Sequence, residues 1–175
     1  MVLIRSYMLH RRGTRAIVFG VTHKSDYFII PVMLFFIYGL ISIVIDLPFP
    51  KILIRPFWDI DVLNICAAAI CTISLIWFGI TLKIFGQSFR VGIDENTGDK
   101  LITTGTFAIS RNPIYVAFIA FFLGVFLAHS NLLISVFLVL FIITVHRQIL
   151  REESFLKKHY GIEYEKYCNE VRRYV

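Results

Sequence analysis

Residues 104–115 read Thr-Gly-Thr-Phe-Ala-Ile-Ser-Arg-Asn-Pro-Ile-Tyr, and they lead into a long apolar run. The run extends from Asn112 to Val145 and contains no Asp, Glu, Lys or Arg in 34 residues. A straight helix of that length would measure about 50 Å, whereas the hydrocarbon core of a bilayer is about 30 Å thick. The polar triplet His129-Ser130-Asn131 lies at the midpoint. We therefore expect two helices in a tight hairpin, whose polar ends meet on one side of a membrane.

The composition also indicates a membrane protein. Hydrophobic residues make up 57% of the chain and charged residues 17%, whereas soluble domains average about 45–50% and 25%. Two more stretches lack charged residues, and each is close to the length of about 20 residues that spans a bilayer as a helix. The predicted fold is an all-α integral membrane protein with about four transmembrane helices, at residues 27–45, 62–82, 113–128 and 131–147. In the second span, Ala67-Ala68-Ala69 and Gly79 are expected to let a neighbouring helix approach closely.

The rest of the chain divides around these spans into a basic segment at 1–26, a connector at 83–111 and a helical tail at 148–175, all within one membrane domain, 1–175. Lys and Arg number five before the first span, two in the first loop, four in the connector, none in the hairpin turn and seven from His146 to the end of the given sequence. Basic loops stay cytoplasmic, so both termini and the connector are predicted on that side. Anionic lipid explains the net charge of +6 better than nucleic acid does. The three cysteines lack the spacing of a metal site.

The tail is expected to fold as a continuation of the fourth span and a final short helix. Gly161 is the predicted end of the first of these helices, because glycine commonly caps a helix C-terminus. A last helix from about Ile162 would place four residues on one face at helical spacing: Tyr164, Tyr167, Val171 and Tyr174.

Two polar motifs flank the hairpin. Arg111 stands beside the N-terminus of the third span, where an anion is favoured, although an arginine that merely marks the membrane edge would have the same sequence. Glu152 and Glu153 follow the fourth span, where they are either part of a site or part of a solvated, charged helix. If the hairpin brings the motifs together, the first reading is favoured for both.

The order and spacing of these motifs resembles the isoprenylcysteine carboxyl methyltransferase family, which is related to the phospholipid N-methyltransferases. The resemblance covers about residues 80–175 and rests on Gly105-x-Phe107, Arg111-Asn-Pro-x-Tyr115, the apolar run, Glu152-Glu153-x-x-Leu156 and Tyr160-Gly161-x-x-Tyr164-x-x-Tyr167. Two positions depart from the family pattern, because Asn112 replaces the usual histidine and Ala117 the usual glycine.

The resemblance implies a membrane enzyme that uses S-adenosyl-L-methionine and takes a lipid or lipidated acceptor from within the bilayer. The predicted catalytic residues are Arg111, which matches the family motif, Asn112, which stands at the position of the family's histidine, and Arg147, whose guanidinium could hold a carboxylate as Arg111 could. The cofactor-binding residues would be Gly105, Phe107, Arg111, Pro113, Tyr115, Glu152, Glu153, Leu156, Tyr164 and Tyr167. Phenylalanines around the site would exclude water or simply face lipid; they are Phe118, Phe121, Phe122, Phe137 and Phe141.

The missing histidine bears on the acceptor. Asparagine does not titrate near pH 7, so Asn112 is no general base. A carboxylate acceptor needs no base, whereas an amine with a pKa near 10 does, and His146 is the only histidine near the second motif. A carboxylate or a thiolate acceptor is therefore favoured, and isoprenylcysteine-type carboxyl methylation is the leading hypothesis. The alternatives are phospholipid N-methylation, a non-catalytic membrane protein that binds ligands on the same scaffold, and a reductase, since the C-terminal region of sterol reductases is similar.

Overall fold

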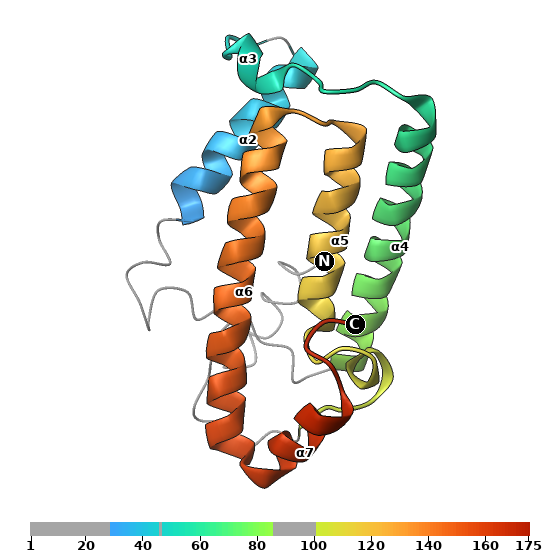
Figure 1. Ribbon diagram of the computed structural model, residues 1–175, viewed down its shortest axis with the longest axis vertical. Helices are drawn as coiled ribbons and strands as arrows, with labels where there is room; N and C mark the ends of the chain where they lie inside the picture. The colour runs from blue at the N-terminus through green and yellow to red at the C-terminus, as the bar shows by residue number, and fades with distance from the viewer. Residues whose placement is uncertain (1–28, 46, 86–100) are drawn as a thin grey trace, which may run out of the picture.

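The computed structural model describes residues 29–45, 47–85 and 101–175, and these residues form helices without any strand (Figure 1). The predicted all-α class is therefore confirmed for this part of the chain. The basic segment 1–26 and residues 86–100 of the predicted connector lie outside the described residues. The helices are α2 (Ile29–Ile45), α3 (Lys51–Ile54), α4 (Asp61–Phe85), the 3-10 turn η3 (Gly105–Ala108), α5 (Pro113–Ala128), α6 (Leu132–Tyr160) and α7 (Ile162–Glu170).

The body of the structure is a layer of three long helices. Figure 1 shows α5 between α4 and α6, with α2 against the end of α6 where the hairpin turns and α7 at the opposite end. Among the described helices, α4 and α6 are long and apolar enough to cross a membrane, and α5 is a shorter apolar helix. The count of four spans and the orientation of the termini remain predictions.

Helix α6 is longer than its predicted span. It runs 29 residues, from Leu132 to Tyr160, which is roughly 43 Å at 1.5 Å per residue. Because the hydrocarbon core is only about 30 Å thick, the charged turns after Val145 extend beyond it. Helix α4 likewise continues to Phe85, three residues into the predicted connector.

The hairpin turn has the local chemistry that its sequence predicted. The side chain of Asn131 caps α6, since its Oδ1 accepts a hydrogen bond of 2.9 Å from the amide of Ile134. The turn is also fastened to the loop before α4. The carbonyl of Ser130 accepts a bond of 2.6 Å from the amide of Phe57, and its Oγ accepts one of 3.2 Å from the amide of Trp58.

Helices α4 and α5 approach most closely at Gly124. A Cβ atom added there would lie 2.6 Å from the Sγ of Cys71 and 3.1 Å from the carbonyl oxygen of Ala67, so no larger residue fits without movement. Of the predicted triplet, Ala67 is buried at this contact, whereas Ala68 and Ala69 are exposed because they lie on other faces of α4. The prediction for Gly79 is wrong, because a Cβ atom there would meet nothing within 4 Å.

An aromatic cluster joins α2 to the hairpin. Phe36 of α2 stacks on Phe137 of α6 with ring centroids 3.6 Å apart. Phe122 of α5 packs edge-on against both rings. Phe137 is only 5% exposed, so it is part of this core and neither faces lipid nor surrounds the polar end of the hairpin.

Candidate active site

The two polar motifs meet at the end of the helix layer opposite the hairpin turn. Arg111 Nη2 lies 3.1 Å from Glu153 Oε1, and the two side chains are only 11% and 12% exposed. The side-chain amide of Asn112 donates to the same oxygen at 3.3 Å. The meeting of the motifs, which the hairpin predicted, is therefore confirmed as geometry.

Local structure explains how Arg111 and Asn112 are held. Gly105 adopts a φ of +64° at the start of η3, a conformation that favours glycine. Phe107 in this turn is buried and stacks on Phe85 at the end of α4, with centroids 5.3 Å apart. Pro113 then occupies the first turn of α5, where its missing N–H costs little. Gly105 and Phe107 therefore shape the loop and are not the groups that line its polar face.

Helix α7 folds back over this loop. Gly161 ends α6 with a φ of +54°, which confirms the predicted cap. Tyr164 and Tyr167 are both buried, as one face of α7 was predicted to be. The rest of that prediction is wrong, because α7 ends at Glu170 and Val171 and Tyr174 lie beyond the helix. The hydroxyl of Tyr167 donates to the carbonyl of Phe107 at 2.6 Å, and burial raises the pKa of Tyr167 to about 12. Burial beside Glu153 also raises the pKa of Tyr164.

The three residues after α7 that contact the site were not predicted. We call residues 172–174 the strap. Arg173 binds Glu153 Oε2 through Nε at 3.0 Å and Nη2 at 2.8 Å. The hydroxyl of Tyr174 lies 2.7 Å from Nδ1 of His146. The signal in the sequence was the Arg-Arg-Tyr group directly after a helix with a buried tyrosine face.

Glu152 has different surroundings from Glu153. Its Oε1 accepts hydrogen bonds from the hydroxyl of Tyr115 at 2.7 Å and from the side-chain amide of Gln148 at 2.9 Å. Both donors are neutral, and neither contacts Oε2. Glu152 lies beyond the apolar part of α6, and burial raises the pKa of its carboxyl group although the two hydrogen bonds lower it. The structure thus contains two adjacent carboxylates in different surroundings. Glu153 is paired with arginines, whereas Glu152 is buried and bonded to neutral side chains.

The remaining predicted residues are placed unequally. Leu156 is half-buried on α6, whereas the side chain of Arg147 is exposed to the outside of the helix layer. Arg111 also donates to the carbonyl of Cys168 at 3.1 Å. Its Nε is buried and has no hydrogen-bond partner in the described part of the chain. No group of three or more His, Cys, Asp or Glu side chains in the described residues is arranged to hold a metal ion.

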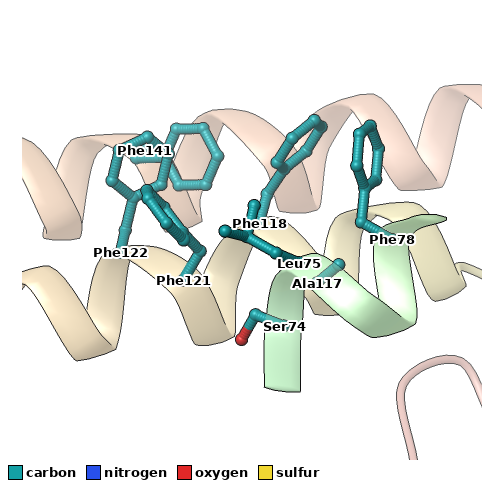
Figure 2. Close-up of a pocket in the computed structure, with 8 residues that line it drawn as sticks. All are labelled: Ser74, Leu75, Phe78, Ala117, Phe118, Phe121, Phe122 and Phe141. Carbon is teal, nitrogen blue, oxygen red and sulfur yellow. The ribbon is translucent and has the colours of Figure 1, made fainter. Parts of the chain in front are cut away.

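An apolar groove begins one turn beyond this cluster (Figure 2). It has a volume of about 320 Å³ and lies over α5, between α4 and α6. Leu75 and Phe78 line it from α4, Ala117 and Phe118 from α5, and Phe141 from α6. Phe118 lies one helical turn from Tyr115. Along α5, the lining of the groove therefore begins within about one turn of the polar end of the hairpin.

The model of the phospholipid methyltransferase family matches residues 61–163, which run from the start of α4 into α7. No curated protein and no solved structure matches the chain. The matched segment includes both polar motifs and the residues that line the groove, and it is more than half of the chain. The chain therefore belongs to the phospholipid methyltransferase family, the family of membrane methyltransferases that includes the isoprenylcysteine carboxyl methyltransferases.

Proposed function

We propose that the chain is an S-adenosyl-L-methionine-dependent methyltransferase that acts on a lipid-like or lipidated acceptor at the cytoplasmic face of a membrane. The observation that carries the proposal is the polar cluster of Arg111, Asn112, Glu152 and Glu153 at one end of an apolar groove. A polar cofactor reaches such a cluster from water, and an apolar acceptor reaches the groove from the bilayer.

The polar groups of the site fit the amino-acid moiety of the cofactor, which carries a carboxylate and an ammonium group. The Nε of Arg111 is a buried donor that suits the carboxylate. The Oε2 of Glu152 is an acceptor that suits the ammonium group or a ribose hydroxyl. Pro113, Leu156, Tyr164 and Tyr167 would frame the rest of the cofactor. Glu153, in contrast, is already held by two arginines.

The residues of this site would act by positioning. The bound cofactor supplies an activated methyl group, so the chain has to orient the reacting groups and exclude water. Tyr115 and Gln148 fix the Glu152 carboxylate in one orientation. Burial of the surrounding side chains lowers the local dielectric and strengthens the interactions of Glu152 and Arg111 with charged ligand groups.

The groove supports an acceptor with a long apolar chain that enters from the bilayer. Its lining is almost wholly hydrocarbon, and the hydroxyl of its one polar residue, Ser74, is bonded to the carbonyl of Ile70 in its own helix. An acyl or prenyl chain in the groove would place its head group near Tyr115. This arrangement uses Phe118, Phe121, Phe122 and Phe141 as the apolar walls of the acceptor site.

For the acceptor atom, carboxyl methylation is the first proposal, because a carboxylate is deprotonated at pH 7 and Arg111 would hold it. One observation favours N-methylation as a second candidate. His146 contacts Tyr174 of the segment that covers the site, and an imidazole there would serve as the base that an amine acceptor needs.

The test uses the full chain in lipid nanodiscs. Calorimetric titration with S-adenosyl-L-methionine is expected to show saturable binding, and a labelled methyl group is expected to appear in the lipid fraction. Label released as methanol by alkali indicates an ester, whereas label that resists alkali indicates an N-methyl group. Absence of cofactor binding would leave a non-catalytic membrane protein on the same scaffold.

A further inference from the structure

We propose that the strap, residues 172–174, is an internal occupant of the site that has to release before a ligand engages Glu153 and Asn112. The identity of that ligand rests on the proposed function, whereas the contacts of the strap do not. The strap would thus be a built-in inhibitory contact between the end of α7 and the two motifs.

The carboxylate of Glu153 has no acceptor position left for a ligand. A carboxylate offers about four lone-pair positions on its two oxygens. Oε1 accepts from Arg111 and Asn112, and Oε2 accepts twice from Arg173. A cationic or hydroxyl group of a ligand therefore reaches Glu153 only by displacing one of these three residues.

The backbone of the strap occupies the polar groups of the first motif in the same way. The carbonyl of Arg173 accepts from the side-chain amide of Asn112 at 3.1 Å and from the hydroxyl of Ser110 at 3.3 Å. The carbonyl of Arg172 accepts from the backbone amide of Arg111 at 3.0 Å. Release of the strap would free one hydrogen-bond donor on each of Ser110, Arg111 and Asn112, because all three donate to carbonyl groups of the strap.

Tyr174 provides the other anchor of the strap. Its hydroxyl contacts His146, which precedes Glu153 by seven residues on α6. Residues at this spacing lie on one face of a helix, two turns apart. The strap therefore lies along α6 and covers the face that carries Glu153.

Of the three residues that hold Glu153, Arg173 is the one most easily released. Its side chain is 36% exposed, compared with 11% for Arg111. Arg111 precedes α5 directly and is tied to α7 as well, whereas Val171–Val175 form no helix or strand. Partly exposed ion pairs contribute little to stability, so water and a charged ligand compete well for Arg173.

A closed strap weakens binding in a predictable way. When only a fraction of molecules is open, the apparent dissociation constant equals the intrinsic constant divided by that fraction. Loosening the strap should therefore tighten apparent binding. If the strap were instead part of the ligand-binding site, loosening it would weaken binding.

The experiment measures strap opening and ligand binding separately, on the full chain in nanodiscs. Hydrogen exchange of the Arg111 amide reports opening, because the strap holds this amide through the carbonyl of Arg172. Arg173→Gln removes the ion pair, and Tyr174→Phe removes the second anchor while leaving the ion pair in place. Arg172→Gln is the matched control, since its side chain is exposed and it makes the same change in charge.

In Arg173→Gln and Tyr174→Phe, exchange at Arg111 is expected to be faster by about fivefold or more. The apparent dissociation constant for S-adenosyl-L-methionine is expected to fall by about threefold or more, and Arg172→Gln should match the parent chain in both measurements. Unchanged exchange in both variants would overturn the proposal, and so would faster exchange with weaker binding. If no chain binds the cofactor, the proposed function fails, and the exchange results alone then support or overturn the releasable strap.

Discussion

The carboxylate of Glu153 on α6 lies 3.1 Å from the guanidinium of Arg111 at the start of α5, and both side chains are about one-tenth exposed. Arg173 contacts the same carboxylate, so two positive charges surround one negative charge. The neighbouring Glu152 accepts only from the neutral side chains of Tyr115 and Gln148 in the contacts described. Two adjacent carboxylates therefore have different surroundings: with the strap closed, Glu153 ties α5, α6 and the strap together, whereas Glu152 is bonded to neutral side chains.

Glu153→Gln is expected to destabilise the fold. The substitution removes the negative charge between two guanidinium groups, and hydrogen bonds to charged groups are worth about 1.5–3 kcal/mol. A thermal melt in detergent should show a lower midpoint than that of the parent chain. Glu163→Gln, which changes an exposed carboxylate on α7, is the control. Equal midpoints for the two variants would mean that Glu153 has no structural role.

Glu152→Gln is expected to weaken cofactor binding without lowering the melting midpoint. The lost charge-assisted bond, worth about 1.5–3 kcal/mol, corresponds to a factor of about ten to a hundred in the dissociation constant. Calorimetric titration with S-adenosyl-L-methionine measures this change. Affinity equal to that of the parent chain would return Glu152 to the reading of a solvated helix residue.

The raised pKa of Glu152 predicts a dependence of stability on pH. Its folded pKa lies above the ordinary value of 4.5 because of burial, so just above that pH the folded chain binds more protons at this site than the unfolded chain. Stability contributed by this group therefore falls as pH rises through that window. Glu152→Gln should therefore gain stability relative to the parent chain as the pH rises above 4.5, in paired melts. If the difference in melting midpoint between Glu152→Gln and the parent chain does not change with pH, the assignment is contradicted.

Gly124→Ala is expected to lower the melting midpoint, because its Cβ atom would lie 2.6 Å from Cys71 Sγ in the contact between α4 and α5. Overpacking of this kind typically costs about 1–3 kcal/mol. Gly79→Ala is the matched control, since nothing lies within 4 Å of the added atom. If both variants melt alike, the close approach of the two helices at Gly124 is not as described.

Leu75→Trp is expected to fill the groove and discriminate between acceptors. Methyl transfer to a long-chain acceptor should show a KM raised by about tenfold, since losing 1–2 kcal/mol of apolar contact has that effect. A short-chain acceptor with the same head group should be little affected. Ile76→Trp is the control, because Leu75 and Ile76 are both 57% exposed and only Leu75 lines the groove. Equal KM changes in the two variants would place the acceptor elsewhere.

Much of the fold follows from local features of the sequence. The bounds of α5 coincide with the predicted span 113–128, because a proline favours the start of a helix and the polar triplet after Ala128 ends the apolar run. The break at Asn131 and the cap at Gly161 were predictable for the same reason. The meeting of Arg111 with Glu153 was also predictable, since a hairpin returns the chain to the level at which it began.

The sequence by itself thus determined the helices, the hairpin and the two motifs that meet at its open end, because apolar run length and capping residues act over a few neighbouring positions. Tertiary structure alone decided which small residue lies at the contact between helices, since Gly124 and Gly79 differ only in what faces them. It also decided that Arg173, and not the exposed Arg147, reaches Glu153. Contacts of this kind join segments far apart in the chain, and no local pattern encodes which of several similar side chains the packing brings together.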